Sequence, residues 1–360
     1  GGDGNVYSYF VSDDSWTETG VTWNNQPTAT TTAALGSWWI WDDGTVHDMV
    51  GTTTTAALTS QVQTELDGDK TLSLMLSSPG YTTTYYTREG DPAKAASLTV
   101  TYEVPQTATL NVVADTWVSQ ASPSANYGTD GSMQVVPPWS GAPAGNVLVK
   151  FDLSSLPAGA VISSATLTAT ASTGFAYGGD GNVYGSFVAD DSWTETGVTW
   201  SNQPTANTAS PLGSWWLWDD GTVHDMVGTF TTPQLAAQVQ TELGGDKTLS
   251  LMLASPGYTT TYYTREGNPA KAATLTVAYL MPETKAIIVS ADTWVSQASP
   301  DTNYGTDSSM QVVPPWSGAP AGNVLVKFDL SSLPATAVIS SATLTATAST
   351  GFAYGGDGNV

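Results

Sequence analysis

The chain has 360 residues, no cysteine, and 32 acidic against nine basic side chains, for a formal net charge of −23. This excess of negative charge argues against nucleic acid or an anionic membrane surface as a partner. No run of 18 apolar residues occurs, so no membrane span is expected.

One sequence recurs along the chain at a fixed spacing. The segment Gly1-Gly-Asp-Gly-Asn-Val6 returns at Gly178 and at Gly355, a step of 177 residues each time. A period this long matches a whole domain rather than a solenoid coil of about 20 to 50 residues. We therefore expect tandem domains, each large enough to be stable without a disulfide or a metal.

Two proline-containing segments mark the expected domain boundaries, Val104-Pro-Gln-Thr-Ala108 and Met281-Pro-Glu-Thr-Lys285. They divide the chain into the C-terminal part of one repeat (1–104), a complete repeat (105–281) and the N-terminal part of the next (282–360). Linkers this short predict little freedom between domains. The phase of the repeat suggests a window on a longer array.

Short β-branched runs bounded by Gly, Pro, Asn and Asp predict strands along the complete repeat. The predicted strands are Leu110–Val113, Met133–Val136, Val147–Leu153, Ala165–Ala171, Val183–Val188, Leu249–Leu253, Thr261–Thr264 and Thr274–Tyr279. Apolar residues and threonines alternate in Thr166-Leu-Thr-Ala-Thr170, which indicates a sheet with one face in the core and one in water.

One helix is predicted, capped by Thr232, with Pro233 in its first turn and its end at Gly244. Three residues would share its buried face: Leu235, Val239 and Leu243. Many short strands with one short helix predict an all-β fold, a jelly-roll-like antiparallel β-sandwich in each domain.

Seven motifs follow one another in the complete repeat. They are Asp115-Thr-Trp-Val118, Pro123-Ser-Ala-Asn-Tyr-Gly128, Val149-Lys-Phe-Asp-Leu-Ser-Ser-Leu-Pro157, Ile162-Ser-Ser-Ala-Thr-Leu167, Asp191-Ser-Trp-Thr-Glu195, Val198-Thr-Trp-Ser-Asn-Gln-Pro204, and Tyr262-Tyr-Thr-Arg-Glu266 followed by Leu275-Thr-Val-Ala-Tyr279. In this order they resemble the DNRLRE domain family, which is similar to the disaggregatase-related repeats and to a group of carbohydrate-binding modules.

The resemblance implies a β-sandwich of secreted bacterial or archaeal proteins, without catalysis and with polysaccharide binding in some members. Some sugar-binding members rely on clustered lysines against acidic polysaccharide. The complete repeat has only four basic residues: Lys150, Lys247, Arg265 and Lys271. An acidic glycan is therefore not the expected ligand.

The densest aromatic cluster is Ser214-Trp-Trp-Leu-Trp-Asp-Asp220. In a strand, Trp216 and Trp218 would share one face and Trp215 the other, so one face belongs to the core. The second face could stack on a sugar ring or on a neighbouring domain. The candidate contact residues for either role are Trp215, Trp216, Trp218, Tyr262, Tyr263, Arg265 and Trp139.

Oxygen-bearing side chains near expected loops are candidate Ca²⁺ ligands. They are Asp115, Asn126, Asp130, Asp219 and Asp220. Turn capping by the same side chains explains them without a metal, and no cofactor is required.

The complete repeat lacks the residues that common catalytic sites require. It has a single histidine, His224, no cysteine and no Gly-x-Ser-x-Gly motif, so triads and zinc sites are not expected. Asp191 and Glu195 could mimic the paired carboxylates of a glycosidase, but a tryptophan-bearing turn at a strand end explains them better. We therefore expect no enzymatic activity.

Two functions stay open. Near-identical copies favour a secreted structural protein, an extracellular filament, fibre or sheath at the cell surface whose partners are other copies of the same domain. The alternative is a multivalent carbohydrate-binding adhesin or stalk, in which repeated weak sites gain avidity for a polysaccharide.

Overall fold

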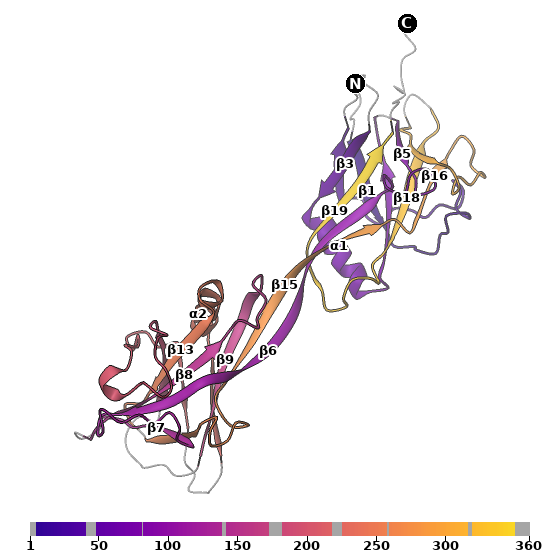
Figure 1. Cartoon of the computed structure of the whole chain (residues 1–360). Helices are drawn as coiled ribbons and strands as arrows, with labels where there is room; N and C mark the ends of the chain where they lie inside the picture. Colours follow the sequence, from indigo (N-terminus) through magenta and orange to yellow (C-terminus); the bar gives the residue numbers. More distant parts are fainter. Residues whose placement is uncertain are drawn as a thin grey trace. The chain divides into compact units, whose positions relative to one another are not determined.

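The computed structural model describes residues 5–40, 48–80, 82–138, 142–172, 182–217, 225–257, 259–315 and 319–349. The chain divides into two compact units, one made of residues 1–104 with 282–360 and the other of residues 105–281 (Figure 1). The first and last segments, which the sequence assigns to two different repeats, therefore fold together into one unit. Both divisions fall in the proline-containing segments.

These two segments are strands rather than loops. β6 (Ser97–Ser119) runs through Pro105, and β15 (Thr274–Ile288) runs through Pro282, each without a break. Proline lacks an N–H donor, but its fixed φ fits extended backbone where no donor is needed. The residues expected as linkers are thus parts of strands.

Two antiparallel sheets make up the unit at residues 105–281. The first has the order β11 (Gly213–Trp216), β10 (Asn182–Val188), β13 (Thr248–Ala254), β8 (Gly145–Asp152) and the second half of β6. The second joins β12 (Met226–Thr231), β9 (Val161–Ala171), β15, β14 (Thr260–Tyr263) and β7 (Ser132–Val135). The predicted all-β antiparallel sandwich is confirmed.

The other unit repeats this arrangement with strands from two distant parts of the sequence. One sheet has the order β16 (Ala291–Ser296), β18 (Gly322–Asp329), β4 (Thr71–Ser77), β1 (Asn5–Val11) and β2 (Gly36–Trp39). The second joins β3 (Met49–Thr54), β19 (Val338–Ala348), the first half of β6, β5 (Thr83–Tyr86) and β17 (Ser309–Val312). At its centre, β4 pairs with β18.

One α-helix packs against the sheets in each unit. α2 (Pro233–Gly244) contacts β9 and β13 (Figure 1). The Thr232 hydroxyl accepts a hydrogen bond from the Leu235 backbone N at 3.1 Å. The buried residues of α2 are Leu235, Val239 and Leu243, so its cap and its buried face are as predicted. α1 (Ala56–Asp67) is the counterpart, and neither helix has the length and apolar character that a membrane span requires.

The unit at residues 105–281 has two apolar clusters. The main core lies between its sheets and includes Trp215, Phe230 and Tyr262. A smaller cluster lies on the outer face of the first sheet, where Trp193 and Val198 pack on strand residues such as Leu148. These two residues come from the loop at residues 189–212, which contains a short 3-10 helix, η2 (Trp200–Asn202). The loop therefore covers part of the outer face of this sheet.

Candidate functional site

Alternate tryptophans lie on opposite faces of β11. Trp215 is 5% exposed, lies in the main core, and donates a hydrogen bond from Nε1 to the Tyr262 hydroxyl at 2.9 Å. Trp216 lies on the other face and is 55% exposed. The alternation expected of a strand is therefore present, and Trp216 is the residue that reaches the surface.

Two predicted contact residues, Trp215 and Tyr262, are core residues. Tyr262 is fully buried, and this burial raises the pKa of its hydroxyl. The Trp215–Tyr262 hydrogen bond satisfies both buried polar groups, as a tightly packed interior requires. Neither side chain can touch a ligand at the surface, which corrects the prediction for both.

A tyrosine on the neighbouring strand shares the outer face with Trp216. In the pairing of β10 with β11, Asn182 lies opposite Trp216 and Tyr184 lies opposite Ser214. Tyr184 and Trp216 are thus diagonal neighbours on one face, about 7–8 Å apart at the backbone. We call Trp216, Tyr184 and Asn182 the aromatic surface of this unit. Sequence reasoning missed Tyr184, because its proximity to Trp216 depends on the pairing of the two strands.

The other unit has an equivalent aromatic surface with one more ring. Trp39 on β2 is 57% exposed, and Tyr7 lies opposite Ser37 on the neighbouring strand. Tyr9 follows on the same face of β1, with its ring centroid 6.4 Å from that of Tyr7. The position of Tyr9 is taken by a serine, Ser186, in the repeat.

Two amide side chains lie on the same outer face. Asn146 on β8 donates a hydrogen bond from Nδ2 to the Gln203 Oε1 at 3.1 Å. Tyr184 pairs with Ala254 on β13, and β13 pairs in turn with β8, so Asn146 is two strands away from Tyr184. Carboxamides carry both donors and acceptors, which suits them to sugar hydroxyl groups.

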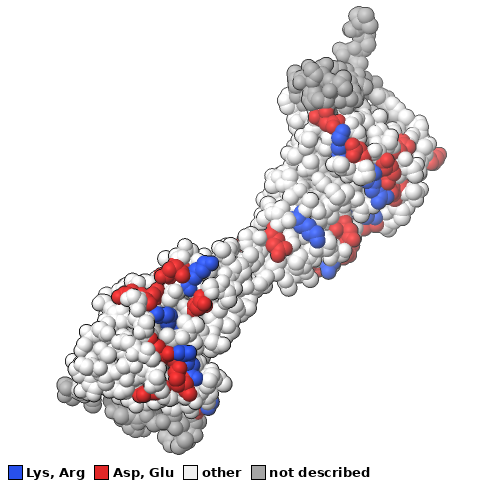
Figure 2. Space-filling model, viewed as in Figure 1, with Lys and Arg blue, Asp and Glu red and all other residues white. Residues whose placement is uncertain are grey.

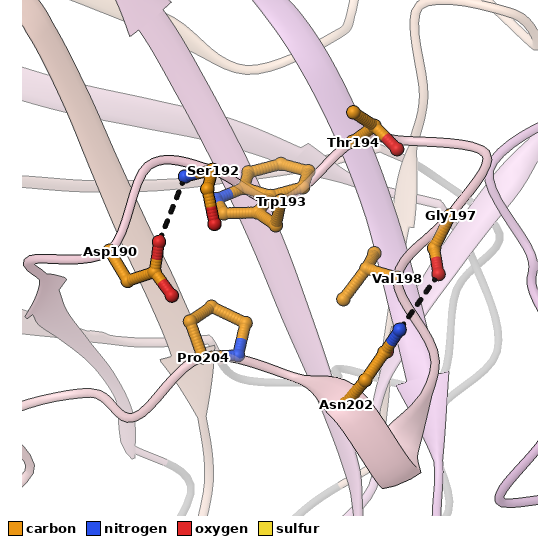
Figure 3. Close-up of a pocket in the computed structure, with 8 residues that line it drawn as sticks. All are labelled: Asp190, Ser192, Trp193, Thr194, Gly197, Val198, Asn202 and Pro204. Carbon is orange, nitrogen blue, oxygen red and sulfur yellow. Dashed lines mark hydrogen bonds between the residues drawn. The ribbon is translucent and has the colours of Figure 1, made fainter.

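A small hollow of about 210 Å³ lies in the loop at residues 189–212. Its lining residues are Asp190, Ser192, Trp193, Thr194, Gly197, Val198, Asn202 and Pro204 (Figure 3). Trp193 is almost fully buried and donates a hydrogen bond to the Ser250 hydroxyl at 3.1 Å. Asn202 donates to the Gly197 carbonyl at 3.1 Å and accepts from the Thr199 backbone N. These polar groups already form hydrogen bonds within the protein, so we attribute the hollow to the folding of the loop rather than to a ligand site.

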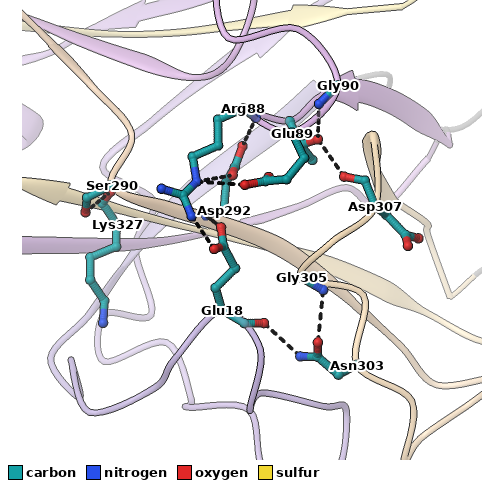
Figure 4. Close-up of polar contacts among 11 residues, drawn as sticks. Glu18, Arg88, Glu89, Gly90, Ser290, Asp292, Asn303, Gly305, Asp307 and Lys327 are labelled. Carbon is teal, nitrogen blue, oxygen red and sulfur yellow. Dashed lines mark hydrogen bonds and ion pairs between the residues drawn. The ribbon is translucent and has the colours of Figure 1, made fainter.

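Arg265, a predicted contact residue, holds a network of carboxylates. Its Nε donates to the Glu195 Oε1 at 3.0 Å, and a second guanidinium nitrogen bonds the Glu195 Oε2. Its backbone N donates to the Asp115 Oδ2 at 3.0 Å. Figure 4 shows the equivalent network of the other unit, which comprises Arg88, Glu18, Glu89 and Asp292. Arg265 thus links β6, the 189–212 loop and the turn after β14.

Asp115 is the fully buried member of this network. Burial away from water raises the pKa of its carboxyl to about 7. Its Oδ1 has no hydrogen-bond donor, and the Arg265 Nε lies 3.7 Å from it. Such an oxygen is unusual in a protein interior.

The other predicted cation ligands do not surround Asp115. Asn126 donates from Nδ2 to the carbonyl oxygens of Glu195 and Val198, at 2.8 and 2.7 Å, so it stabilises a loop. Asp130 is exposed, and the carboxylates close to Asp115 are Glu195 and Glu266. Four further predicted site residues lie outside the described residues: Trp139, Trp218, Asp219 and Asp220.

Two lysines of this unit, Lys150 and Lys271, are bonded to neighbouring oxygen atoms. Lys150 donates to the carbonyl oxygens of Asp191 and Trp193, both at 2.7 Å, and lies over the Trp193 ring. Lys271 forms an ion pair with Asp225 and lies over the ring of Tyr263, another predicted contact residue. On the face shown in Figure 2, Lys and Arg side chains lie beside acidic ones. That face offers no separate basic surface among the described residues.

Comparison with known proteins gives one family. The model of carbohydrate-binding module family 96 matches residues 1–102, 106–279 and 283–353. No curated protein matches the chain. Among solved structures, the Gt strain of infectious bursal disease virus is 10% identical, with 85% of this chain and 81% of that chain covered and a TM-score of 0.15. The VP2 subviral particle of that virus is 10% identical, with coverages of 85% and 80% and a TM-score of 0.14. Likenesses this weak carry no argument.

Proposed function

The chain belongs to carbohydrate-binding module family 96, and we propose that each unit binds a polysaccharide through its aromatic surface, without catalysing a reaction. The observation that supports this most is the exposure of Trp216 and Trp39, which occupy equivalent positions on the outer faces of the two units. An exposed indole offers a large, flat apolar area together with one N–H donor. Both features suit the apolar face and the hydroxyl edge of a sugar ring.

The charge of the chain favours a neutral glycan. A net charge of −23 repels a polyanionic ligand. Lys150, Lys271 and Arg265 are held by carbonyl oxygens or carboxylates, and so they are not arranged to receive one. Two strands away from Tyr184, the same outer face instead carries the neutral amides of Asn146 and Gln203.

Two units in one chain make the binding multivalent. A long polysaccharide repeats its own binding site, so that two weak contacts can be made at once and strengthen retention. We also propose that the chain lies outside a bacterial or archaeal cell, and that the DNRLRE-like motifs form the framework of each unit.

The filament or sheath role rests on the sequence repeat alone. The family and the exposed tryptophans both support carbohydrate binding. Carbohydrate binding therefore takes precedence over the filament role.

Affinity electrophoresis tests the proposal. The chain is run through gels that contain neutral β-glucan, xylan or galactomannan, and through gels that contain alginate or polygalacturonate. We expect a neutral polysaccharide to slow the chain, the variant with both Trp39→Ala and Trp216→Ala to lose this retardation, and each single variant to keep part of it.

A matched control removes exposed apolar side chains from the other sheet of each unit. Val50→Ala with Val227→Ala changes two residues of similar exposure and should leave the retardation unchanged. Unchanged binding by the double tryptophan variant, or no retardation by any glycan, would overturn the proposal. Retardation by acidic glycans alone would overturn the ligand class.

A further inference from the structure

Three carboxylates converge in each unit, away from the aromatic surface residues. In the unit at residues 105–281 they belong to Asp115, Glu195 and Glu266, and one oxygen of each lies within 4.8 Å of the other two. Ca²⁺ binds oxygens at about 2.4 Å, so two oxygens on one ion can be at most about 4.8 Å apart. The spacing therefore allows all three groups to hold the same ion.

One of these oxygens is buried and has no hydrogen-bond donor. The Asp115 side chain is 0% exposed, and its Oδ2 is satisfied by the Arg265 backbone N. Its Oδ1 is 3.7 Å from the Arg265 Nε, beyond hydrogen-bond distance, and the same nitrogen lies close to Glu195 and Glu266. A buried carboxylate oxygen left in this state is costly unless a positive charge completes its surroundings.

The positive charge of Arg265 is too small to balance the three carboxylates. Among the described residues, Arg265 is the cationic side chain that contacts the three carboxylates, and its single positive charge cannot balance all three when they are ionised. The Arg265 side chain is 39% exposed, so the group borders the solvent, whereas Asp115 lies on β6 with its side chain fully buried. An ion can therefore enter from the solvent side.

We propose that Asp115, Glu195 and Glu266 bind one Ca²⁺ ion, with the Asp115 Oδ1 as its buried ligand. Calcium is favoured over magnesium because it accepts several carboxylates in flexible geometry, while magnesium requires a near-ideal octahedron and keeps much of its water. The other unit repeats the site with a fully buried Asp292, whose Oδ1 also has no donor. The chain thus has two equivalent calcium sites.

The ion joins three segments that are distant in the sequence. Asp115 lies on β6, Glu195 lies in the loop at residues 189–212, and Glu266 lies in the turn after β14. Calcium therefore fixes the loop that covers the outer cluster and carries Gln203. The site does not depend on carbohydrate binding, and either proposal can fail without the other.

Calorimetric titration of the chelator-treated chain with CaCl₂ tests the site. We expect two ions per chain, a rise in the melting temperature, and an affinity for Mg²⁺ at least tenfold lower. Glu266→Gln should reduce the number of ions to one, because the intact site of the other unit remains. Glu266→Gln with Glu89→Gln should reduce it to zero.

The second acidic group of the unit provides the control. Asp191, Glu242 and Asp246 are also close together, and the Asp191 Oδ1 likewise has no donor, but no side chain of this group is fully buried and, among the described residues, no arginine forms an ion pair with it. We therefore expect Asp246→Asn to leave two ions per chain. Terbium luminescence excited through tryptophan, and displaced by Ca²⁺, reports binding without any substitution. No calcium binding at millimolar concentration, or two ions bound to the double glutamine variant, overturns the inference.

Discussion

The ring of Phe230 fills the space beside Gly185 in the main core. A Cβ on Gly185 would lie 2.7 Å from the Phe230 Cζ, which is too close for two nonbonded carbon atoms. The other unit has Ser8 and Thr53 at the equivalent positions. The Gly185–Phe230 pair in one unit and the Ser8–Thr53 pair in the other thus fill equivalent volumes in different ways.

Gly185→Ser should lower the free energy of unfolding of its unit by about 1–3 kcal/mol, because the new side chain overpacks the core against Phe230. Adding Phe230→Thr creates the pair found in the other unit, so the double variant should be more stable than the sum of the two single effects. Urea unfolding of the four proteins measures this coupling. Strict additivity would show that the two residues do not share the volume.

The hydrogen bond between Trp215 and Tyr262 should contribute about 1–2 kcal/mol to stability. Tyr262→Phe removes the acceptor and leaves the buried Trp215 Nε1 without a partner, which is the costly way to lose a hydrogen bond. Thermal unfolding with near-UV circular dichroism measures the change. Glycan retardation should not change, because this pair lies in the core; a loss of binding without a loss of stability would contradict that placement.

Stability should depend on pH through Asp115. The pKa of this carboxyl is raised by burial from an ordinary 3.8 to about 7. The folded chain therefore holds the proton more tightly than the unfolded chain, and the resulting stabilisation is complete below pH 3.8 and is lost as the pH rises through 7.

In the presence of a chelator, we expect the free energy of unfolding to fall by roughly 2–4 kcal/mol between pH 4 and pH 7 in each unit. Asp115→Asn should flatten this slope in its own unit, since the amide has no charge to bury. Urea unfolding across this pH range gives the comparison. An equal slope in the variant would assign the pH dependence to other groups.

The extra ring of Tyr9 should make the aromatic surface of its unit the tighter one. In a Trp216→Ala background, which leaves the surface around Trp39 as the aromatic site, Tyr9→Ser should weaken glycan binding about two- to tenfold. In a Trp39→Ala background, Ser186→Tyr should strengthen it by a similar factor. Calorimetry with the glycan that slows the chain most measures both changes, and equal affinities in all four proteins would remove Tyr9 from the surface.

The fold could be predicted because its signals are local. The alternation in Thr166-Leu-Thr-Ala-Thr170 and the cap at Thr232 need only neighbouring residues to be recognised. β12 was missed because Gly228 weakens its strand pattern. That glycine has a tertiary reason: a Cβ there would lie 2.5 Å from the Trp215 indole.

The sites were only partly predictable, because they depend on contacts between segments that are distant in the sequence. Trp216 and Asp115 were singled out by residue type, but their neighbours come from distant segments. Glu195 lies 80 residues after Asp115 and Arg265 lies 150 residues after it, so no local spacing reveals the network. Asn126 and Asp130 had the right chemistry for a cation, but the backbone uses Asn126 to fasten a loop.

The discontinuous unit has a consequence for folding order. Its central pairing joins Val324 to Leu76, whereas the equivalent pairing in the continuous unit joins Val147 to Leu253, a separation less than half as long. Closing the longer loop costs only about 0.7 kcal/mol more, but such distant pairing slows folding. We expect refolding in two kinetic phases, of which the fast one belongs to residues 105–281. Gly185→Ser should then perturb the fast phase alone. The pairing of β4 with β18, which joins the N-terminal and C-terminal segments, should form last.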